Sequence, residues 1–273
     1  MNPGPSDPVE VKPGDGPIVL GLPHTGTWLP AEIFRHLNAN GRLLADTDWH
    51  IDKLYSGLLP NATTVRAVFH RYCIDPNRDP TGASLYPGQN TTGLLPLTDF
   101  DGEPIWQSEP DQADIAAALE RFHQPYHSRL ADELERVRAR NGLAILYDCH
   151  SIRSRAPHLF EGRLPDFNIG TNGGNTCAPQ IEEAVAAICE TAEGYTSTVN
   201  GRFKGGWTTR HYGRPEDGIH AIQMELAQST HLSSETPPFT FDEGKAARLR
   251  AHLSKILNTL NDLALSGALN PRG

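Results

Sequence analysis

The residues best suited to chemistry are Asp148 and His150, which follow the apolar run Leu143–Tyr147. Because they are two residues apart, they would share one face of a strand. A carboxylate beside an imidazole orients the ring, fixes its tautomer and prepares it to bind a metal. In open α/β sheets, ligands bind at the carboxyl ends of the strands, where this pair lies. The competing interpretation is a strand end with two solvated residues. Cys149 would point to the opposite face, and we expect it in the core.

Two other segments carry candidate metal ligands. His24 follows the apolar run Pro17–Leu22 and precedes a glycine-containing turn, which suits a residue facing a cleft, although a loop or capping histidine would have the same pattern. Asp46, Asp48 and His50 place two carboxylates and an imidazole within five residues. The competing interpretation is a helix start capped by Asp46 or Asp48, where acids interact favourably with the helix dipole.

Glu225 lies in the apolar run Ile219–Ala227. A carboxylate in so apolar a strand should be paired or take part in the chemistry, and we favour the second. Two histidines, a carboxylate and an unligated glutamate are the side chains of a catalytic zinc hydrolase, in which three protein ligands leave the fourth position to water. The metal lowers the pKa of that water, and Glu225 would take its proton.

Two segments offer donors for an anionic ligand. Asn77 and Arg78 stand between two prolines, and an arginine can bind a carboxylate through two parallel hydrogen bonds. A solvated loop with an Asp75–Arg78 ion pair is the competing interpretation. The glycine-flanked segment 199–213 adds four candidates, which are Arg202 or Arg210 for a carboxylate and His211 or Tyr212 as hydrogen-bond donors. Surface arginines on a hairpin are the alternative there.

The elements that must position these residues alternate between strand and helix patterns. The patterns predict strands at 17–22, 143–150 and 219–227, a strand or hairpin at 63–74, and helices at 30–38, 111–140 with a break at Pro125, 178–193 and 244–265. Residues 81–110 show no period, and we expect them to form a flap over the site. The sequence therefore predicts a single α/β domain over residues 17–273, with a mixed, mostly parallel central sheet flanked by helices, after a flexible segment of residues 1–16.

The whole chain has 273 residues, a formal charge of −9 and a mean hydropathy of −0.45. The negative charge argues against nucleic-acid binding, which needs a basic surface. No apolar run is long enough to cross a membrane, and the first residues lack a signal-peptide pattern, so we expect a cytoplasmic protein. The four cysteines show no CxxC spacing and are expected to be free thiols. The oligomeric state is left open.

Six ordered motifs resemble the N-formylglutamate amidohydrolase (N-formylglutamate deformylase) family of histidine degradation. They are PHTGTWLP, DTDWHIDKLY, DPNRDPTG, DCHSIRSRAPHLFEGRLPDFNIGT, NGRFKGGWTTRHYG and IQMELAQ, spread from about Ile18 to about Leu232. The family is in turn distantly similar to zinc carboxypeptidases and aspartoacylases, which implies a zinc-carboxypeptidase-like fold. Four of that superfamily's functional positions are matched here by His24, Asn77–Arg78, His150 and Glu225.

One position departs from the superfamily pattern. A ligand glutamate usually stands three residues after the first histidine, and this chain has Thr27 there. We therefore assign Asp48 as the third ligand beside His24 and His150, with His50, Asp46 and Asp148 as alternatives. Asp148 is otherwise the hydrogen-bond partner of His150.

The resemblance implies a small anionic substrate and a divalent metal, with zinc as the first choice, although iron, manganese and cobalt suit the same ligands. N-formyl-L-glutamate would place its carboxylates on Arg78 and Arg210, with Asn77 and His211 assisting, and metal-bound water would release formate and L-glutamate. Glu225 would carry the proton. The alternatives are a related metal amidase for another N-acyl amino acid and a non-catalytic binding protein for an acidic metabolite.

Overall fold

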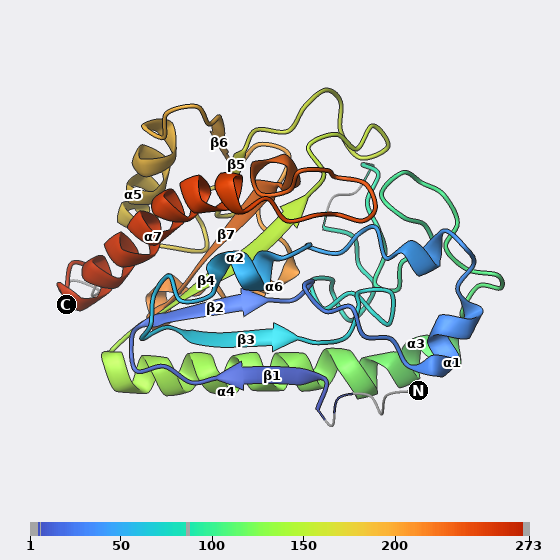
Figure 1. Ribbon diagram of the computed structural model, residues 1–273. Helices are drawn as coiled ribbons and strands as arrows, with labels where there is room; N and C mark the ends of the chain where they lie inside the picture. Colours follow the sequence, from blue (N-terminus) through green and yellow to red (C-terminus); the bar gives the residue numbers. More distant parts are fainter. Residues whose placement is uncertain (1–4, 6, 86–87, 270–273) are drawn as a thin grey trace.

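The computed structural model describes residues 5, 7–85 and 88–269, and its centre is a seven-stranded sheet in the order β1-β3-β2-β4-β7-β5-β6. The strands are β1 (Val9–Lys12), β2 (Ile18–Leu22), β3 (Thr63–Ala67), β4 (Ala144–Ile152), β5 (Phe167–Gly170), β6 (Ser197–Val199) and β7 (Ile219–Ala227). The long strands β4 and β7 are buried along their whole length. They form the middle of the molecule (Figure 1).

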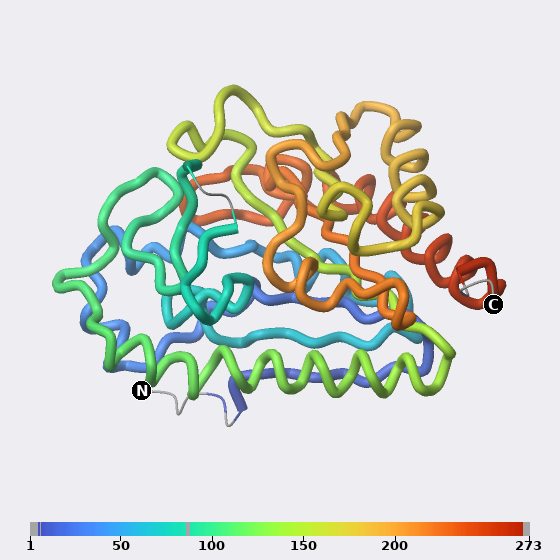
Figure 2. Tube along the Cα trace, turned by 180° about the vertical axis from the view of Figure 1, so that it is seen from behind, coloured from blue at the N-terminus to red at the C-terminus, as the bar shows by residue number. Residues whose placement is uncertain are grey.

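Strand direction decides where polar side chains can meet. β3, β2, β4 and β7 run parallel to one another. β1 pairs antiparallel with β3, and β5 pairs antiparallel with β7. The carboxyl ends of the four parallel strands therefore lie at one edge of the sheet. Figures 1 and 2 show the long loops of the chain gathered at this edge, away from the C-terminus.

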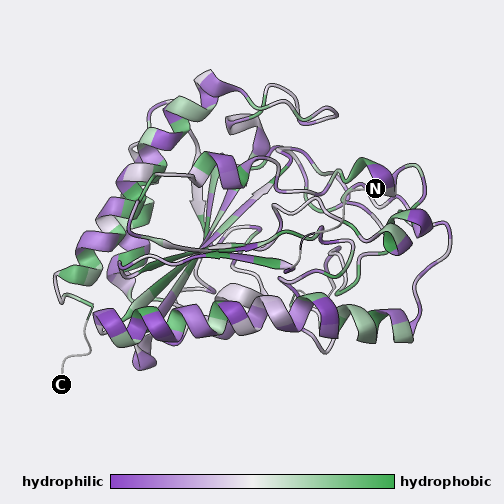
Figure 3. Ribbon diagram, turned by 60° about the horizontal axis from the view of Figure 1, so that its bottom comes forward, coloured by the Kyte–Doolittle hydropathy of each residue, from purple (hydrophilic) through white to green (hydrophobic). Residues whose placement is uncertain are grey.

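Helices cover both faces of the sheet. They are α1 (Ala31–His36), α2 (Ile51–Tyr55), α3 (Gln112–Ala118), α4 (Gln124–Asn141), α5 (Pro179–Glu190), α6 (Trp207–Tyr212) and α7 (Glu243–Leu265), with short helices η1 (Gly41–Leu43), η2 (Leu119–His123), η3 (Pro215–Asp217) and η4 (Gln228–Thr230). α2, α5 and α7 pack on one face, and α4 and η2 pack on the other. Figure 3 shows hydrophobic and hydrophilic colour on these helices, as expected when each buries one side.

The alternation of side chains along β4 divides the core into these two layers. Ile145, Tyr147 and Cys149 point into the layer with α2, α5 and α7. Ala144 and Leu146 point into the layer with α4. The same alternation carries on past Leu146, so Asp148 and His150 emerge on the α4 side, at the edge where the loops lie.

The α/β fold class is confirmed, with a mixed central sheet flanked by helices. The predicted strands 17–22 and 219–227 and the predicted helices 178–193 and 244–265 correspond to β2, β7, α5 and α7. The predicted break at Pro125 is present as well, because the π-helical turn η2 separates α3 from α4. A proline lacks the N–H that a regular helix would use, which suits a change of helix type there. All four cysteines are free and buried.

Some elements differ from the prediction. Residues 9–12, placed in the flexible segment 1–16, form β1, because β3 offers them an open edge for antiparallel pairing. The strand expected over 63–74 ends at Ala67, after which the chain turns. Neither Asp46 nor Asp48 caps α2, whose N-cap is His50 in a left-handed conformation. Residues 86 and 87 of the expected flap lie outside the described residues.

No helix within the described ranges is long and apolar enough to cross a membrane.

The α7 layer gives a stability prediction. Leu253 is fully buried on α7, and Leu253→Ala should lower the free energy of unfolding by about 2–5 kcal/mol because it leaves a cavity. Leu265, on the last turn of the same helix, is 61% exposed, and Leu265→Ala should change it by less than about 0.5 kcal/mol. Urea unfolding measures both, and equal losses would contradict this packing.

Candidate active site

His24, Asp48 and His150 meet at the carboxyl edge of the sheet, and all three are buried. His24 comes two residues after β2, His150 is the seventh residue of β4, and Asp48 lies in the loop before α2. A backbone hydrogen bond from Asp48 N–H to the His24 carbonyl (3.0 Å) joins the two loops. One ligand atom from each of the three residues lies within 4.8 Å of the others.

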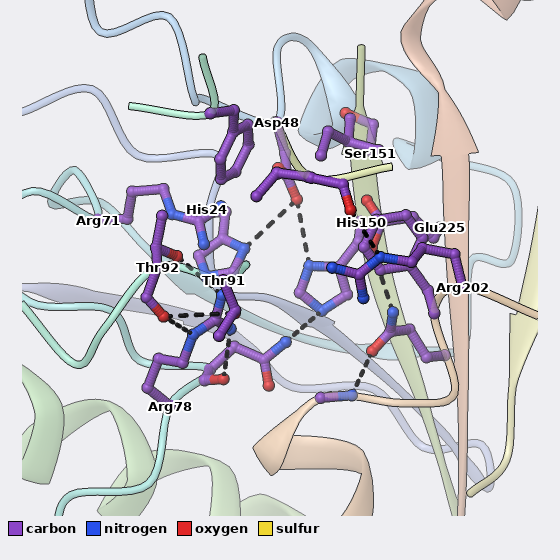
Figure 4. A pocket seen from close by; sticks show the side chains of 17 residues that line it. His24, Asp48, Arg71, Arg78, Thr91, Thr92, His150, Ser151, Arg202 and Glu225 are labelled. Atoms are coloured by element: carbon purple, nitrogen blue, oxygen red, sulfur yellow. Dashed lines mark hydrogen bonds and ion pairs between the residues drawn. The ribbon is translucent and has the colours of Figure 1, made fainter. Parts of the chain in front are cut away.

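The two imidazoles present the same nitrogen to Asp48. Its Oδ2 lies 3.2 Å from His150 Nδ1 and 3.7 Å from His24 Nδ1. On its far side each ring meets another carboxylate: His24 Nε2 lies 2.7 Å from Asp75 Oδ1, and His150 Nε2 lies 3.0 Å from Asp148 Oδ1. Figure 4 shows both rings facing Asp48. Asp75 behind His24 favours the proton on Nε2, which leaves Nδ1 able to act as a ligand. Behind His150, Nε2 faces both Asp148 Oδ1 and, at 3.2 Å, Nδ2 of Asn77.

The outer carboxylates are themselves held in place. Asp75 is fully buried and accepts hydrogen bonds from Arg71 and from the Asn77 N–H (2.8 Å). Asp148 accepts a hydrogen bond from the Thr209 hydroxyl in α6 (2.9 Å). On the side away from Asp48, each imidazole therefore contacts a carboxylate that is itself held by hydrogen bonds.

Burial and charge act against each other in this cluster. Burial favours a higher pKa for Asp48, but hydrogen bonds from His150 and His24 outweigh it and lower the pKa. Arg71, Arg78 and His24 likewise overcome the burial of Asp75 and hold its pKa well below the usual range. Burial would lower the pKa of His150, but Asp148 and Asp48 raise it well above the usual value. The carboxylates around the two imidazole rings therefore favour a positive charge in the site.

The donor set fits a divalent cation. Two imidazole nitrogens and one carboxylate are a ligand set found in catalytic zinc sites, where a further position stays open. Here Nδ1 of His24, Nδ1 of His150 and a carboxylate oxygen of Asp48 converge. The carboxylates behind the rings are the usual partners of metal-binding histidines.

A cavity opens directly over this group, and Glu225 of β7 lines it. Glu225 stands opposite His150 in the β4–β7 pairing, which brings the carboxylate to the same edge. Burial raises the pKa of Glu225 to about 8, against the opposing charge of His150. Gln223, on the same face of β7, donates a hydrogen bond from Nε2 to Glu225 Oε2 (3.2 Å) and accepts one from the Gly206 N–H (2.7 Å).

Three arginines line the same cavity, namely Arg71, Arg78 and Arg202. Figure 4 shows Arg71 and Arg78 on one side of His150 and Arg202 on the other. The loop over residues 81–110 contributes Thr91, Thr92 and Phe100 to the walls, in line with the expected flap. Arg78 is braced by this loop, through hydrogen bonds to the carbonyl and the hydroxyl of Thr92 (both 2.9 Å).

The predicted residues separate into two groups. The structure brings together His24, Asp48, Asn77, Arg78, Asp148, His150 and Glu225.

Two others lie outside the cavity wall. Arg210 Nε donates to the Gly205 carbonyl (2.9 Å), and the exposed His211 ring stacks on Trp207. The reason is that residues 207–212 form α6, whose first turn reaches the site while the next residues turn away. Arg202 lines the cavity instead.

Two of the three alternative third ligands, Asp46 and His50, are engaged elsewhere, and the third, Asp148, contacts the far nitrogen of His150, Nε2. Asp46 accepts hydrogen bonds from the Tyr72 hydroxyl (2.9 Å) and the Phe100 N–H (3.2 Å). His50 Nε2 donates to the Phe239 carbonyl (2.9 Å). Neither side chain points toward His24, which leaves Asp48 as the carboxylate that completes the group.

Four contributors were not identified from the sequence. They are Arg71, Asp75, Thr209 and Gln223. Asp75 was considered only as a local partner of Arg78, and their closest atoms are 3.8 Å apart. Its place two residues before Asn77 in the DPNRDPTG motif was the available signal. Gln223 shares a strand face with Glu225, which also could have indicated it.

A buried His-Asp-His group beneath a cavity that also holds a buried glutamate is the architecture of a hydrolase. The family model described as N-formylglutamate amidohydrolase matches residues 16–232. The chain belongs to this family.

Two relatives and one solved structure agree with that assignment. N-formylglutamate deformylase of Pseudomonas aeruginosa is 44% identical over 252 residues, which cover 91% of this chain and 94% of that protein. The Pseudomonas putida protein of the same name is 44% identical over 247 residues, or 89% and 92% of the two chains. The crystal structure of N-formylglutamate amidohydrolase from Ralstonia eutropha JMP134 matches with a TM-score of 0.80 at 26% identity, and covers 95% of this chain and 99% of that one.

Gly206 gives a test of the position of Asn77. A Cβ at Gly206 would lie 2.2 Å from Asn77 Nδ2, while the extended backbone there accepts any residue. Gly206→Ala should therefore displace the Asn77 side chain and lower kcat/KM by roughly 10²-fold, as misplacement by about 1 Å can. Kinetics on N-formyl-L-glutamate, the compound in the relatives' names, measure this.

Gly93→Ala is the matched control for Gly206→Ala. Gly93 lies in the loop that covers the cavity, and its added Cβ would meet only the Leu95 carbonyl at an ordinary 3.7 Å. Its kinetics should equal those of the wild type. Wild-type kinetics in Gly206→Ala would show that the Asn77 position does not matter.

Proposed function

We propose that this chain hydrolyses N-formyl-L-glutamate to formate and L-glutamate. The main support is one arrangement: the buried His24–Asp48–His150 group lies beside Glu225 in a cavity lined by three arginines. The names of relatives 44% identical over most of the chain support the choice of substrate. In a chain of charge −9, a cavity with three guanidinium groups suits a dianion.

We place the two substrate carboxylates on Arg78 and Arg202. Both guanidinium groups line the cavity, which therefore offers two cations to a ligand with two acids. Arg202 is held by hydrogen bonds to the Leu159 and Asn90 carbonyls (both 3.0 Å). Asn77, whose Oδ1 accepts the Thr208 N–H (2.9 Å) and whose Nδ2 lies 3.2 Å from His150 Nε2, lines the cavity beside Arg78 and would contact the same ligand. Arg71 is tied to Asp75 and contributes its charge to the cavity wall.

The proposal includes a divalent cation, with zinc as the first choice, on Nδ1 of His24, Nδ1 of His150 and the Asp48 carboxylate. When bound, such a cation polarises a carbonyl oxygen and makes water a better nucleophile at neutral pH. Asp75 and Asp148 hold the two rings so that Nδ1 faces the ion.

Glu225 moves the proton in this proposal. Burial raises the pKa of Glu225 to about 8, and a bound cation nearby would favour its ionised form. In that form its carboxylate accepts a proton from the water that adds to the formyl carbon. The C–N bond then breaks, and Glu225 delivers that proton to the departing nitrogen. L-glutamate and formic acid leave, and the formic acid ionises to formate. The hydrogen bond from Gln223 keeps the carboxylate aimed into the cavity during both transfers. The cavity walls keep the substrate within reach of these groups.

Formate release from N-formyl-L-glutamate tests the proposal. The chain should release formate, lose the activity on treatment with a chelator, and regain it when zinc is added back, because the cation supplies the nucleophile and the polarisation. N-acetyl-L-aspartate and N-formyl-L-methionine, each assayed alongside, should react far more slowly. Release that is equally fast with chelator present would contradict the metal, and no release under any metal condition would contradict the reaction.

Glu225→Gln separates proton transfer from metal binding. The amide keeps the shape of the side chain but cannot accept the proton, so turnover should fall by roughly 10²–10⁴. The metal content, measured by mass spectrometry, should equal that of the wild type because the three ligands are intact. Wild-type turnover in this variant would contradict the assigned role of Glu225.

A further inference from the structure

Two histidines that the proposed reaction does not use lie directly behind the Asn77–Arg78 segment. His123 is the last residue of the π-helical turn η2, and His127 stands four residues later on α4. Residues four apart share one face of a helix, so both rings point the same way. His123 is 2% exposed, and neither ring lines the cavity.

Both rings bind backbone carbonyls on either side of Asn77. His127 Nε2 lies 2.7 Å from the Pro76 carbonyl oxygen, and His123 Nε2 lies 3.0 Å from the Arg78 carbonyl oxygen. A carbonyl oxygen only accepts hydrogen bonds, so each Nε2 carries the proton and donates. The two bonds hold the peptide group before Asn77 and the peptide group after Arg78, so they bracket the Asn77–Arg78 pair.

The other backbone groups of this segment are held by Asp75 and by the Arg78 side chain. The Asn77 N–H donates to Asp75 Oδ1 (2.8 Å), and the Arg78 N–H donates to the Asp75 carbonyl (3.2 Å). The Asn77 carbonyl accepts from Arg78 Nη1 (3.1 Å). Without the two imidazoles, the Pro76 and Arg78 carbonyls would lose these partners, and the segment that aims Asn77 and Arg78 would be held only by its contacts with Asp75 and the Arg78 side chain.

The surroundings keep the two rings neutral and in place. Burial lowers the pKa of His127 to about 3 and also lowers that of His123. The Trp207 ring packs against both, with ring centres 4.7 Å from His127 and 5.7 Å from His123. Trp207 opens α6, whose next residue donates its N–H to Asn77 Oδ1. Trp207 therefore connects the two imidazoles, which hold the backbone around Asn77, with the helix that holds the Asn77 side chain.

We propose that His123 and His127 are positioning residues for substrate binding: they fix the peptide group before Asn77 and the one after Arg78, so that Asn77 and Arg78 hold a substrate carboxylate. The inference rests on the proposed function, because it assigns a binding role to that pair. It predicts that losing either donor weakens binding of the substrate while the chemical step continues.

Replacement by leucine and by glutamine tests this role. His127→Leu removes the donor and should lower kcat/KM on N-formyl-L-glutamate by roughly 10²-fold, mostly through a higher KM. His127→Gln restores an N–H donor on a side chain of similar reach and should recover most of the loss. His123→Leu and His123→Gln form a second pair that decides the question if His127→Leu fails to fold, as judged by circular dichroism and thermal unfolding.

His220→Leu is the matched control. His220 is as buried as His123 and bonds to a backbone group, the Ala178 N–H (3.2 Å), but it lies away from the cavity. Its loss should lower the melting temperature and leave kcat and KM per folded molecule unchanged.

Three results would overturn the inference. They are a glutamine variant as impaired as the leucine variant, a loss that falls on kcat with KM unchanged, and a KM increase of the same size in His220→Leu. Each of these results bears on the inference only if the wild-type chain is active. A wild-type chain that releases no formate is a different result, which overturns the proposed function and removes this inference with it.

Discussion

Asp48 lies between two buried imidazoles, and the rest of the site depends on that arrangement. A buried carboxylate stays charged only where positive charge or hydrogen-bond donors surround it. Here the donors are His24 and His150, and each ring is turned toward Asp48 by a further carboxylate, Asp75 or Asp148. Three carboxylates surround two imidazoles, so the cluster can accept further positive charge. It therefore suits a bound cation and differs from an ion-pair network in which every charge is already balanced.

The sheet brings this cluster together from distant parts of the chain. β2, β4 and β7 are neighbours and run parallel, so the residues at their carboxyl ends meet without long side chains. His150 and Glu225 stand opposite each other in one register, which sets the acid beside the imidazole. Loops supply the rest, and Asp75 connects the two parts because it binds His24 with one oxygen and Arg71 with the other.

The sequence predicted the parts of this arrangement that depend on local pattern. His150 and Glu225 were identified because polar residues at the ends of long apolar strands are rare without a purpose. Asp48 was chosen through family motifs, since nothing local separates it from Asp46 or His50. The structure separates them through tertiary contacts, which place the other two side chains against unrelated partners.

Other contributors depend on contacts that no local pattern encodes. Arg71 fell within the strand or hairpin predicted over 63–74, and Asp75 was considered only as a partner of Arg78. Their contact with each other and the contact of Asp75 with His24 become visible only in the fold. Arg210 was assigned to a substrate carboxylate with the family resemblance, since the glycine-flanked segment 199–213 alone did not separate it from Arg202. In the fold, α6 turns that side chain away and Arg202 lines the cavity. β1 escaped prediction because its partner strand is remote in sequence.

The most direct test of the cation site is an anomalous difference map from crystals grown with zinc and measured above the zinc absorption edge. The account predicts one peak about 2.0–2.1 Å from Nδ1 of both His24 and His150, and about 2.0–2.2 Å from a carboxylate oxygen of Asp48. A peak bound through Nε2, or an ordered cavity with no peak at any zinc concentration, would contradict it.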